Sequence, residues 1–221
     1  MSGPAFPSGQ AGPSCPVALE LAGVSKRFGD LLVIERASLK VAHGRVLCLL
    51  GPSGIGKTAL LEIMSGLSKP DTGQATVNTP PSVLFQDNLL IPWLSALANV
   101  TYILPKTMGS EEAEQTARRW LETFGLEPGK FPQAMSGGMR RRLALARAMA
   151  AGRSLLLLDE PFAFLDPLWR ELIATLVSQE AISGTAVALT GHSEPEELRA
   201  LLPGRLDAIE LASQPIRLCW P

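Results

Sequence analysis

The sequence predicts an α/β fold, and three observations support this prediction. Three short apolar runs have the length and composition of buried strands in a parallel sheet: residues 46–50, 154–158 and 185–190. Segments with helix-forming composition follow these runs or lie between them, at residues 59–64, 143–149 and 167–181. At the junction between the first strand and the first helix, the chain reads Gly-Pro-Ser-Gly-Ile-Gly-Lys-Thr. A glycine-rich turn between a buried strand and a helix is typical of an α/β domain that binds an anion.

The 221-residue chain is long enough for one large α/β domain, or for a core with a smaller subdomain. Hydrophobic residues make up 46% of it and charged residues 19%, as in ordinary globular proteins. The net charge of −1 provides no broad basic surface, so we expect no nucleic-acid partner. No stretch approaches the ~18 uninterrupted apolar residues of a membrane-spanning helix, so we expect the chain not to cross a membrane itself.

The cysteines and the N-terminal segment indicate the compartment. Cys15, Cys48 and Cys219 are odd in number and widely spaced, so they form no zinc or disulfide pattern and predict a reducing cytosol. Residues 1–16 are rich in Gly, Pro and Ser, and they lack the basic segment followed by an apolar one of a secretory signal. We therefore predict a flexible tail over residues 1–16 and a folded domain over residues 17–221.

The glycine-rich turn matches the phosphate-binding pattern Gly-x-x-x-x-Gly-Lys-Ser/Thr. Gly51, Gly54 and Gly56 allow the backbone to bend so that several N–H groups point at one anion, and the helix N-terminus adds partial positive charge. Lys57 is expected to reach the β- and γ-phosphates, and the Thr58 hydroxyl is expected to hold Mg²⁺. A chance glycine-rich turn is the alternative, which the flanking strand and helix disfavour. The predicted nucleotide-binding residues of this loop are Gly51, Pro52, Ser53, Gly54, Ile55, Gly56, Lys57, Thr58 and Ala59.

Polar residues follow three predicted strands, at the edge of the sheet where α/β proteins bind ligands. Gln86 ends the run at 82–85, and Asp159 and Glu160 end the run at 154–158. Asp159 is expected to orient Mg²⁺ and Glu160 to polarise an attacking water; the alternative is that these acids cap the next element. His192 follows the run at 185–190, where it either contacts a γ-phosphate or lies in a solvent-facing loop.

Residues 87–135 differ from their surroundings and are predicted to form a helical subdomain inserted into the α/β core. The apolar stretch at 89–94, which contains Trp93, is followed by helix-forming segments at 95–104 and 110–124. The apolar stretch is either a docking surface for another protein or part of a buried subdomain core.

Three further features of the sequence have open interpretations. Ser136-Gly137-Gly138 precedes a strong Ala/Leu helix and resembles a second anion site with a hydroxyl and bare backbone donors. The arginine run at 140–142 could bind phosphate, although a solvated helix face is the commoner use of such a run. Phe28 either stacks on an adenine ring or is an aromatic residue of a turn that covers the sheet edge.

Taken together, the motifs resemble the ATP-binding subunit of ABC (ATP-binding cassette) transporters, from about residue 17 onward. The matching motifs occur in the family's order: residues 51–58, Gln86, Met-Ser-Gly-Gly-Met at 135–139, residues 155–162, Phe-Leu-Asp at 164–166, and His192. The segment at 135–139 is the most specific, because other phosphate-loop kinases and GTPases lack it. Residues 85–93 also resemble the nitrate/sulfonate/taurine importer branch of the family.

The resemblance implies a fold and a mechanism. The fold is a P-loop NTPase core with an antiparallel β subdomain and an inserted helical subdomain. Two subunits form a homodimer that closes over two ATP molecules, each between the phosphate loop of one chain and Ser136, Gly137 and Gly138 of the other. Binding of ATP drives closure, because the second chain completes the set of donors.

The resemblance also assigns roles to single residues. Glu160 acts on the hydrolytic water, and His192 lies at the γ-phosphate. Gln86 contacts Mg²⁺ or the water, Asp166 lies near the dimer seam, and Phe28 stacks on adenine. The helical subdomain receives a transmembrane permease subunit at the cytoplasmic side of the inner membrane, and a solute-binding protein acts indirectly.

The chain departs from the family pattern at four places, one of which is the region between Gly73 and Gln86, which is shorter than usual. Met135 stands where Leu is usual, and Arg141 stands where Gln is frequent. Gly191 separates Thr190 from His192, whereas the family's His follows the strand directly. A weakened His192 contact is expected to slow hydrolysis without preventing ATP binding.

Two other functions remain as alternatives to an importer ATPase. A soluble ABC ATPase of DNA repair or translation usually carries two cassettes or a coiled-coil insertion, and neither is found in this sequence. A nucleotide-binding regulatory protein with impaired catalysis is disfavoured by intact Lys57, Asp159 and Glu160, although Gly191 favours it slightly. The solute of an importer, a nitrate, sulfonate or taurine-like ion, is indicated only by the segment at 85–93.

Overall fold

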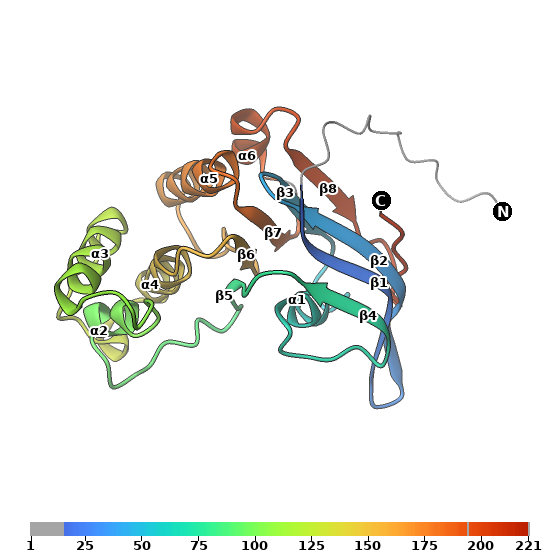
Figure 1. The fold of residues 1–221 in the computed structure, drawn as a ribbon, viewed down its shortest axis with the longest axis horizontal. Helices are drawn as coiled ribbons and strands as arrows, with labels where there is room; N and C mark the ends of the chain where they lie inside the picture. Colours follow the sequence, from blue (N-terminus) through green and yellow to red (C-terminus); the bar gives the residue numbers. More distant parts are fainter. Residues whose placement is uncertain (1–15, 194, 221) are drawn as a thin grey trace.

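The computed structural model describes residues 16–193 and 195–220 (Figure 1). The tail predicted for residues 1–16 therefore lies, except for Pro16, outside the described residues. The described part of the chain contains two β-sheets and a set of helices. No helix within it is long and apolar enough to cross a membrane.

The smaller sheet is antiparallel and has three strands in the order β2-β1-β4. Its strands are β1 (Val17–Phe28), β2 (Leu31–Ala42) and β4 (Thr72–Val77). The strand β4 begins at Thr72, which pairs with Ser25 of β1. This sheet is the antiparallel β subdomain that the resemblance implies.

The larger sheet is parallel and has five strands in the order β5-β6-β7-β3-β8. Its strands are β3 (Val46–Leu50), β5 (Ser82–Leu84), β6 (Leu155–Leu158), β7 (Ala186–Gly191) and β8 (Leu206–Glu210). The α/β fold and the three buried strands read from the sequence are thus confirmed. Because all five strands run the same way, the residues that follow β3, β5, β6 and β7 meet at one edge.

Successive side chains of β3 point to opposite faces of the parallel sheet, and each face packs against its own hydrophobic cluster. Val46, Cys48 and Leu50 contribute to a cluster with the helices α4 (Gly137–Ala150) and α5 (Pro167–Ile182), whereas Leu47 and Leu49 pack in a cluster with α1 (Lys57–Ser65), β1 and β2. The helices are α1 (Lys57–Ser65), α2 (Ala96–Thr101), α3 (Ser110–Thr123), α4 (Gly137–Ala150), α5 (Pro167–Ile182) and α6 (Glu196–Leu201), with a 3₁₀ turn at Pro132–Ala134. Both faces of the parallel sheet are therefore covered, which explains its unbroken apolar strands.

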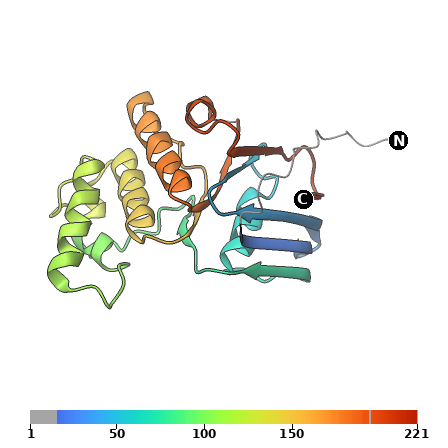
Figure 2. The same ribbon diagram turned by 45° about the horizontal axis from the view of Figure 1, so that its top comes forward.

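The stretch between β5 and α4 holds α2 and α3, which lie away from the antiparallel sheet (Figures 1 and 2). The helix predicted at 95–104 is shorter, since α2 ends at Thr101 and turns follow. Buried Asn99 organises the segment before α2: its Oδ1 accepts from the Ile91 N–H at 2.9 Å, and its Nδ2 donates to the carbonyl of Leu94 at 2.9 Å. Residues 89–94 therefore have a defined conformation although they form no helix or strand.

Candidate functional site

The phosphate-binding pattern lies between β3 and α1, as the sequence predicts. Gly56 is the N-cap of α1 with φ 113°, and a Cβ there would approach Val33 Cγ1 to 2.6 Å. Only glycine fits this combination of backbone angle and close neighbour. The loop is therefore held tightly against β2, with the helix N-terminus behind it.

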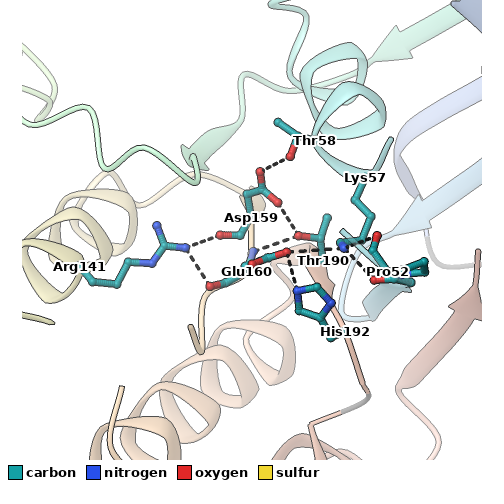
Figure 3. A network of polar contacts seen from close by, with 9 residues as sticks. Pro52, Lys57, Thr58, Arg141, Asp159, Glu160, Thr190 and His192 are labelled. Carbon is teal, nitrogen blue, oxygen red and sulfur yellow. Dashed lines mark hydrogen bonds and ion pairs between the residues drawn. The ribbon is translucent and has the colours of Figure 1, made fainter. Parts of the chain in front are cut away.

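The Lys57 ammonium folds back over the loop. It is 5% exposed, and its Nζ donates to the carbonyl of Gly51 at 2.8 Å and to that of Pro52 at 3.2 Å (Figure 3). A buried ammonium needs such partners, because its desolvation is otherwise very costly. The positive charge predicted for phosphate binding is thus placed at the carboxyl edge of the sheet.

Asp159 joins the elements around this charge. The side chain is buried; its Oδ2 accepts from the Thr58 hydroxyl at 2.8 Å and its Oδ1 accepts from the Thr190 hydroxyl at 2.5 Å. Its backbone N–H donates to the carbonyl of Leu84 at 2.8 Å. One residue at the end of β6 therefore connects α1, β7 and β5.

Glu160 has a constrained backbone. Its φ is +47°, a left-handed conformation that costs a non-glycine residue about 1–3 kcal/mol. Its N–H donates to the Thr190 hydroxyl at 2.9 Å. In this conformation its Oε1 lies 3.5 Å from Lys57 Nζ and 3.3 Å from His192 Nε2 (Figure 3).

His192 reaches Glu160 although Gly191 precedes it. Gly191 is the last residue of β7, pairs with Leu50, and accepts a hydrogen bond from the Gly51 N–H at 3.1 Å. The extra glycine therefore extends the strand toward the phosphate loop. The His192 ring lies beside Glu160 with 55% of its side chain exposed.

A pocket of about 270 Å³ brings seven of the predicted residues together. It is lined by Ser53, Gly54, Gly56, Lys57, Thr58, Gln86 and Glu160. The Thr58 hydroxyl and the Asp159 carboxylate, in mutual contact, are the hard oxygen donors that Mg²⁺ uses alongside nucleotide phosphates. Among the described residues there is no group of three or more His, Cys, Asp or Glu that could hold a metal on its own.

The other predicted residues do not line this pocket. Ser136 caps α4 by accepting from the Met139 N–H at 3.3 Å, and Asp166 caps α5 by accepting from the Trp169 N–H at 3.1 Å. Phe28 ends β1 at the hairpin turn, is 48% exposed, and has the Lys26 ammonium 5.9 Å from its ring centre. The contacts predicted between Ser136, Asp166 or Phe28 and a nucleotide depend on a ligand or a second chain, so they stay predictions.

Sequence reasoning missed Thr190 and Arg141. Thr190 is a fully buried hydroxyl at the end of an apolar strand, a position where a polar side chain needs a specific partner. Arg141 is 4% exposed, so a solvated face is the wrong interpretation for it. The helix period contained the signal, because Ala144, Leu145 and Ala148 share the face of Arg141 and are apolar.

Comparisons with known proteins agree with this geometry. The family model described as "ABC transporter" matches residues 34–163, more than half of the chain. A second model, described as an AAA domain, matches residues 130–199.

Two curated relatives show the level of similarity. "Aliphatic sulfonates import ATP-binding protein SsuB 3" of Rhodococcus jostii is 41% identical over 193 residues, which are 83% of this chain and 69% of that protein. "Taurine import ATP-binding protein TauB" of Burkholderia pseudomallei is 37% identical over 185 residues, 78% of this chain and 71% of that protein.

Two solved structures share the fold. The dimeric structure of MJ0796, a bacterial ABC transporter cassette, matches with a TM-score of 0.77 and 26% identity over 89% of this chain and 96% of that one. A dimeric post-hydrolysis state of the same cassette, bound to ADP and Pi, matches with a TM-score of 0.73 and 28% identity over 79% and 88% of the two chains.

The contacts of Thr190 lead to a prediction about stability. Thr190→Val removes the acceptor of the Glu160 N–H and the donor to Asp159, so we expect the free energy of unfolding to fall by about 1–3 kcal/mol. Urea titration measures this. Thr175→Val is the matched control, because within residues 16–193 and 195–220 the Thr175 hydroxyl donates only to the carbonyl of Glu171 in its own helix. Equal free energies for the two variants would contradict the role given to Thr190.

Proposed function

Since the chain belongs to the ABC transporter family and is an ATPase of that family, we propose that it powers the import of a small organic sulfonate by ATP-driven closure of a dimer. One observation carries the mechanistic part. The phosphate loop, Gln86 and Glu160 line one pocket, beside which Asp159 meets Thr58, while the Ser136 segment lies outside it. The pocket has the parts needed for phosphoryl transfer to water but lacks the second set of anion donors.

The chemistry assigned to the pocket follows from its charges. Lys57 neutralises the β- and γ-phosphates of ATP, and the Glu160 carboxylate orients and polarises the attacking water. Thr58 and Asp159, with Gln86 nearby, would hold Mg²⁺, and the ion would supply further positive charge against the phosphates. Lys57 Nζ and Glu160 Oε1 lie 3.5 Å apart and form an ion pair. A γ-phosphate bound at Lys57 replaces Glu160 as the partner of the ammonium, so the Glu160 carboxylate becomes available to the attacking water. His192, 3.3 Å from Glu160, supports the same carboxylate and reaches the γ-phosphate.

The missing donors come from a second copy of the chain. Gly137 and Gly138 lie in the first turn of the 14-residue helix α4, and the N–H groups of this first turn have no acceptor within the helix. A helix N-terminus preceded by the Ser136 hydroxyl is suited to the γ-phosphate of a nucleotide held by another chain. The solved cassette to which this fold is similar is a dimer, which supports the arrangement.

A permease segment docks where the Gln86 loop meets the helical stretch. A pocket of about 430 Å³ there is lined by Gln86, Asp87, Asn88, Leu89, Leu90, Pro92, Pro132, Gln133 and Arg140. Leu89 and Trp93 are 58% and 75% exposed, which favours a docking surface over a buried subdomain core. The chain would then lie at the cytoplasmic side of the inner membrane, with the permease contact adjoining the nucleotide pocket through Gln86.

The proposed solute rests on similarity. The relatives named above are an aliphatic sulfonate importer subunit and a taurine importer subunit, both more than 35% identical. A solute-binding protein and the permease select the solute, so this chain contributes energy and not specificity.

Removal of the proposed general base tests the mechanism. In Glu160→Gln, we expect ATP turnover to fall about 100-fold or more, because a positioned base contributes about 10²–10⁴ in rate, while ATP affinity is retained. Turnover of purified protein with its permease measures this. The control is Glu171→Gln, an exposed carboxylate of α5 that should leave turnover unchanged. Wild type and Glu160→Gln of equal activity would refute the proposal.

Growth of the source organism tests the solute. A strain without this chain should grow normally on sulfate but not on ethanesulfonate or taurine as sole sulfur source. Wild-type protein should restore growth, whereas Lys57→Ala should not, because it lacks the charge that neutralises the phosphates. Unimpaired growth of the deletion strain on both sulfonates would contradict the assignment.

A further inference from the structure

Arg141 is a buried cation in α4, and both terminal nitrogens of its guanidinium donate hydrogen bonds to uncharged oxygens. Its Nη1 donates to the carbonyl of Phe85 at 2.7 Å and to Asn88 Oδ1 at 3.1 Å, with a longer contact of 3.4 Å to the carbonyl of Gln86. Its Nη2 donates to the carbonyl of Asp159, in its shortest contact, and to that of Glu160 at 2.9 Å (Figure 3). Its Nε has no partner among the described residues, so the two terminal nitrogens make all of these bonds.

The five acceptors belong to two loops that follow neighbouring strands. Residues 85–88 follow β5, and residues 159–160 follow β6. Each loop contributes one side chain to the nucleotide pocket, Gln86 from the first and Glu160 from the second. A planar guanidinium can donate in two directions at once, which a single ammonium or hydroxyl cannot do.

The contact to Glu160 holds a strained residue. The left-handed backbone of Glu160 persists only if its surroundings fix it. Its N–H is fixed by Thr190 and its carbonyl by Arg141. Both backbone polar groups of the proposed general base are therefore held by side chains from other elements.

Arg141 keeps its positive charge although burial of the guanidinium costs desolvation free energy. Burial lowers the pKa of its guanidinium, and the nearby Asp159 and Glu160 carboxylates oppose this shift. An arginine nevertheless stays protonated in proteins, so a full positive charge lies beneath both loops. An uncharged side chain could pack at this position with a smaller desolvation cost. The hydrogen bonds to the two loops therefore explain why the position holds an arginine.

We propose that Arg141 is a positioning residue for hydrolysis: it locks the Gln86 loop to the Glu160 backbone and thereby sets the Glu160 carboxylate against the γ-phosphate. The inference rests on the proposed role of Glu160. Arg141 lies about 1.4 helical turns after Ser136, so a displacement of the start of α4 moves Arg141 and, with it, both loops. Contact of a second chain with Ser136 is thus transmitted to this chain's own catalytic loop.

Arg141→Met and Arg142→Met form a matched pair that tests this. Arg142 is the next residue of the same helix; its guanidinium donates to the carbonyl of Phe124 at 2.7 Å and lies 4.0 Å from the Trp169 ring centre, away from both loops. In the full chain assembled with its permease, we expect Arg141→Met to lower kcat about 10- to 100-fold, with KM and ATP affinity within threefold of wild type. Arg142→Met should keep wild-type kcat. Arg141→Gln, which keeps two N–H donors, should recover part of the turnover.

Amide exchange provides a readout that does not depend on turnover. Residues 86–90 and 159–163 should exchange faster in Arg141→Met than in Arg142→Met, with the rest of the sheet unchanged. The proposal is overturned if Arg141→Met keeps kcat within twofold of wild type. It is also overturned if the two variants lose turnover equally, or if exchange at the two loops is unchanged. A wild-type chain that does not hydrolyse ATP would refute the role of Glu160, and the exchange comparison would still decide whether Arg141 holds the loops.

Discussion

The nucleotide pocket depends on the hydrogen bonds of one buried carboxylate, that of Asp159. Both of its oxygens accept from threonine hydroxyls, Thr58 at the start of α1 and Thr190 at the end of β7. Its own N–H donates to the end of β5. A buried charge is tolerated only with such partners, so the same bonds that satisfy Asp159 bring together the phosphate loop, the Glu160 turn and the Gln86 loop.

This constraint explains why the site is ordered within one chain, and in the proposed mechanism a second chain completes it. Lys57, Thr58 and Glu160 are placed by the sheet edge and the buried network beneath it. Ser136 caps its own helix α4, and it lies outside the pocket together with Gly138. The family's dimeric structures support a shared site. In the proposed coupling, Arg141 connects the N-terminal end of α4 to the two loops of the nucleotide pocket in the same chain.

Much of this was predictable from the sequence, because strand ends and glycine-rich turns have local signals. The α/β fold, the family and the ATPase activity are confirmed. The contact of His192 with Glu160 was not foreseen, since a one-residue spacing does not reveal that Gly191 extends β7. Arg141 was misread because a run of charges suggests solvent, whereas the helix phase places only its middle residue on the buried face. The roles of Phe28 and Asp166 stay predictions, because they depend on nucleotide or on a second chain.

The central claim, that two copies share each ATP site, is tested most directly by mixing two inactive variants. Lys57→Ala damages the phosphate loop, and Ser136→Arg damages the donors offered to the partner. A mixed dimer has one site in which both are damaged and one in which both are intact. With random pairing in an equal mixture, half of the dimers are mixed and each has one complete site of two, so ATP turnover should recover to about a quarter of wild type. A mixture that stays as inactive as each variant alone would contradict the shared site.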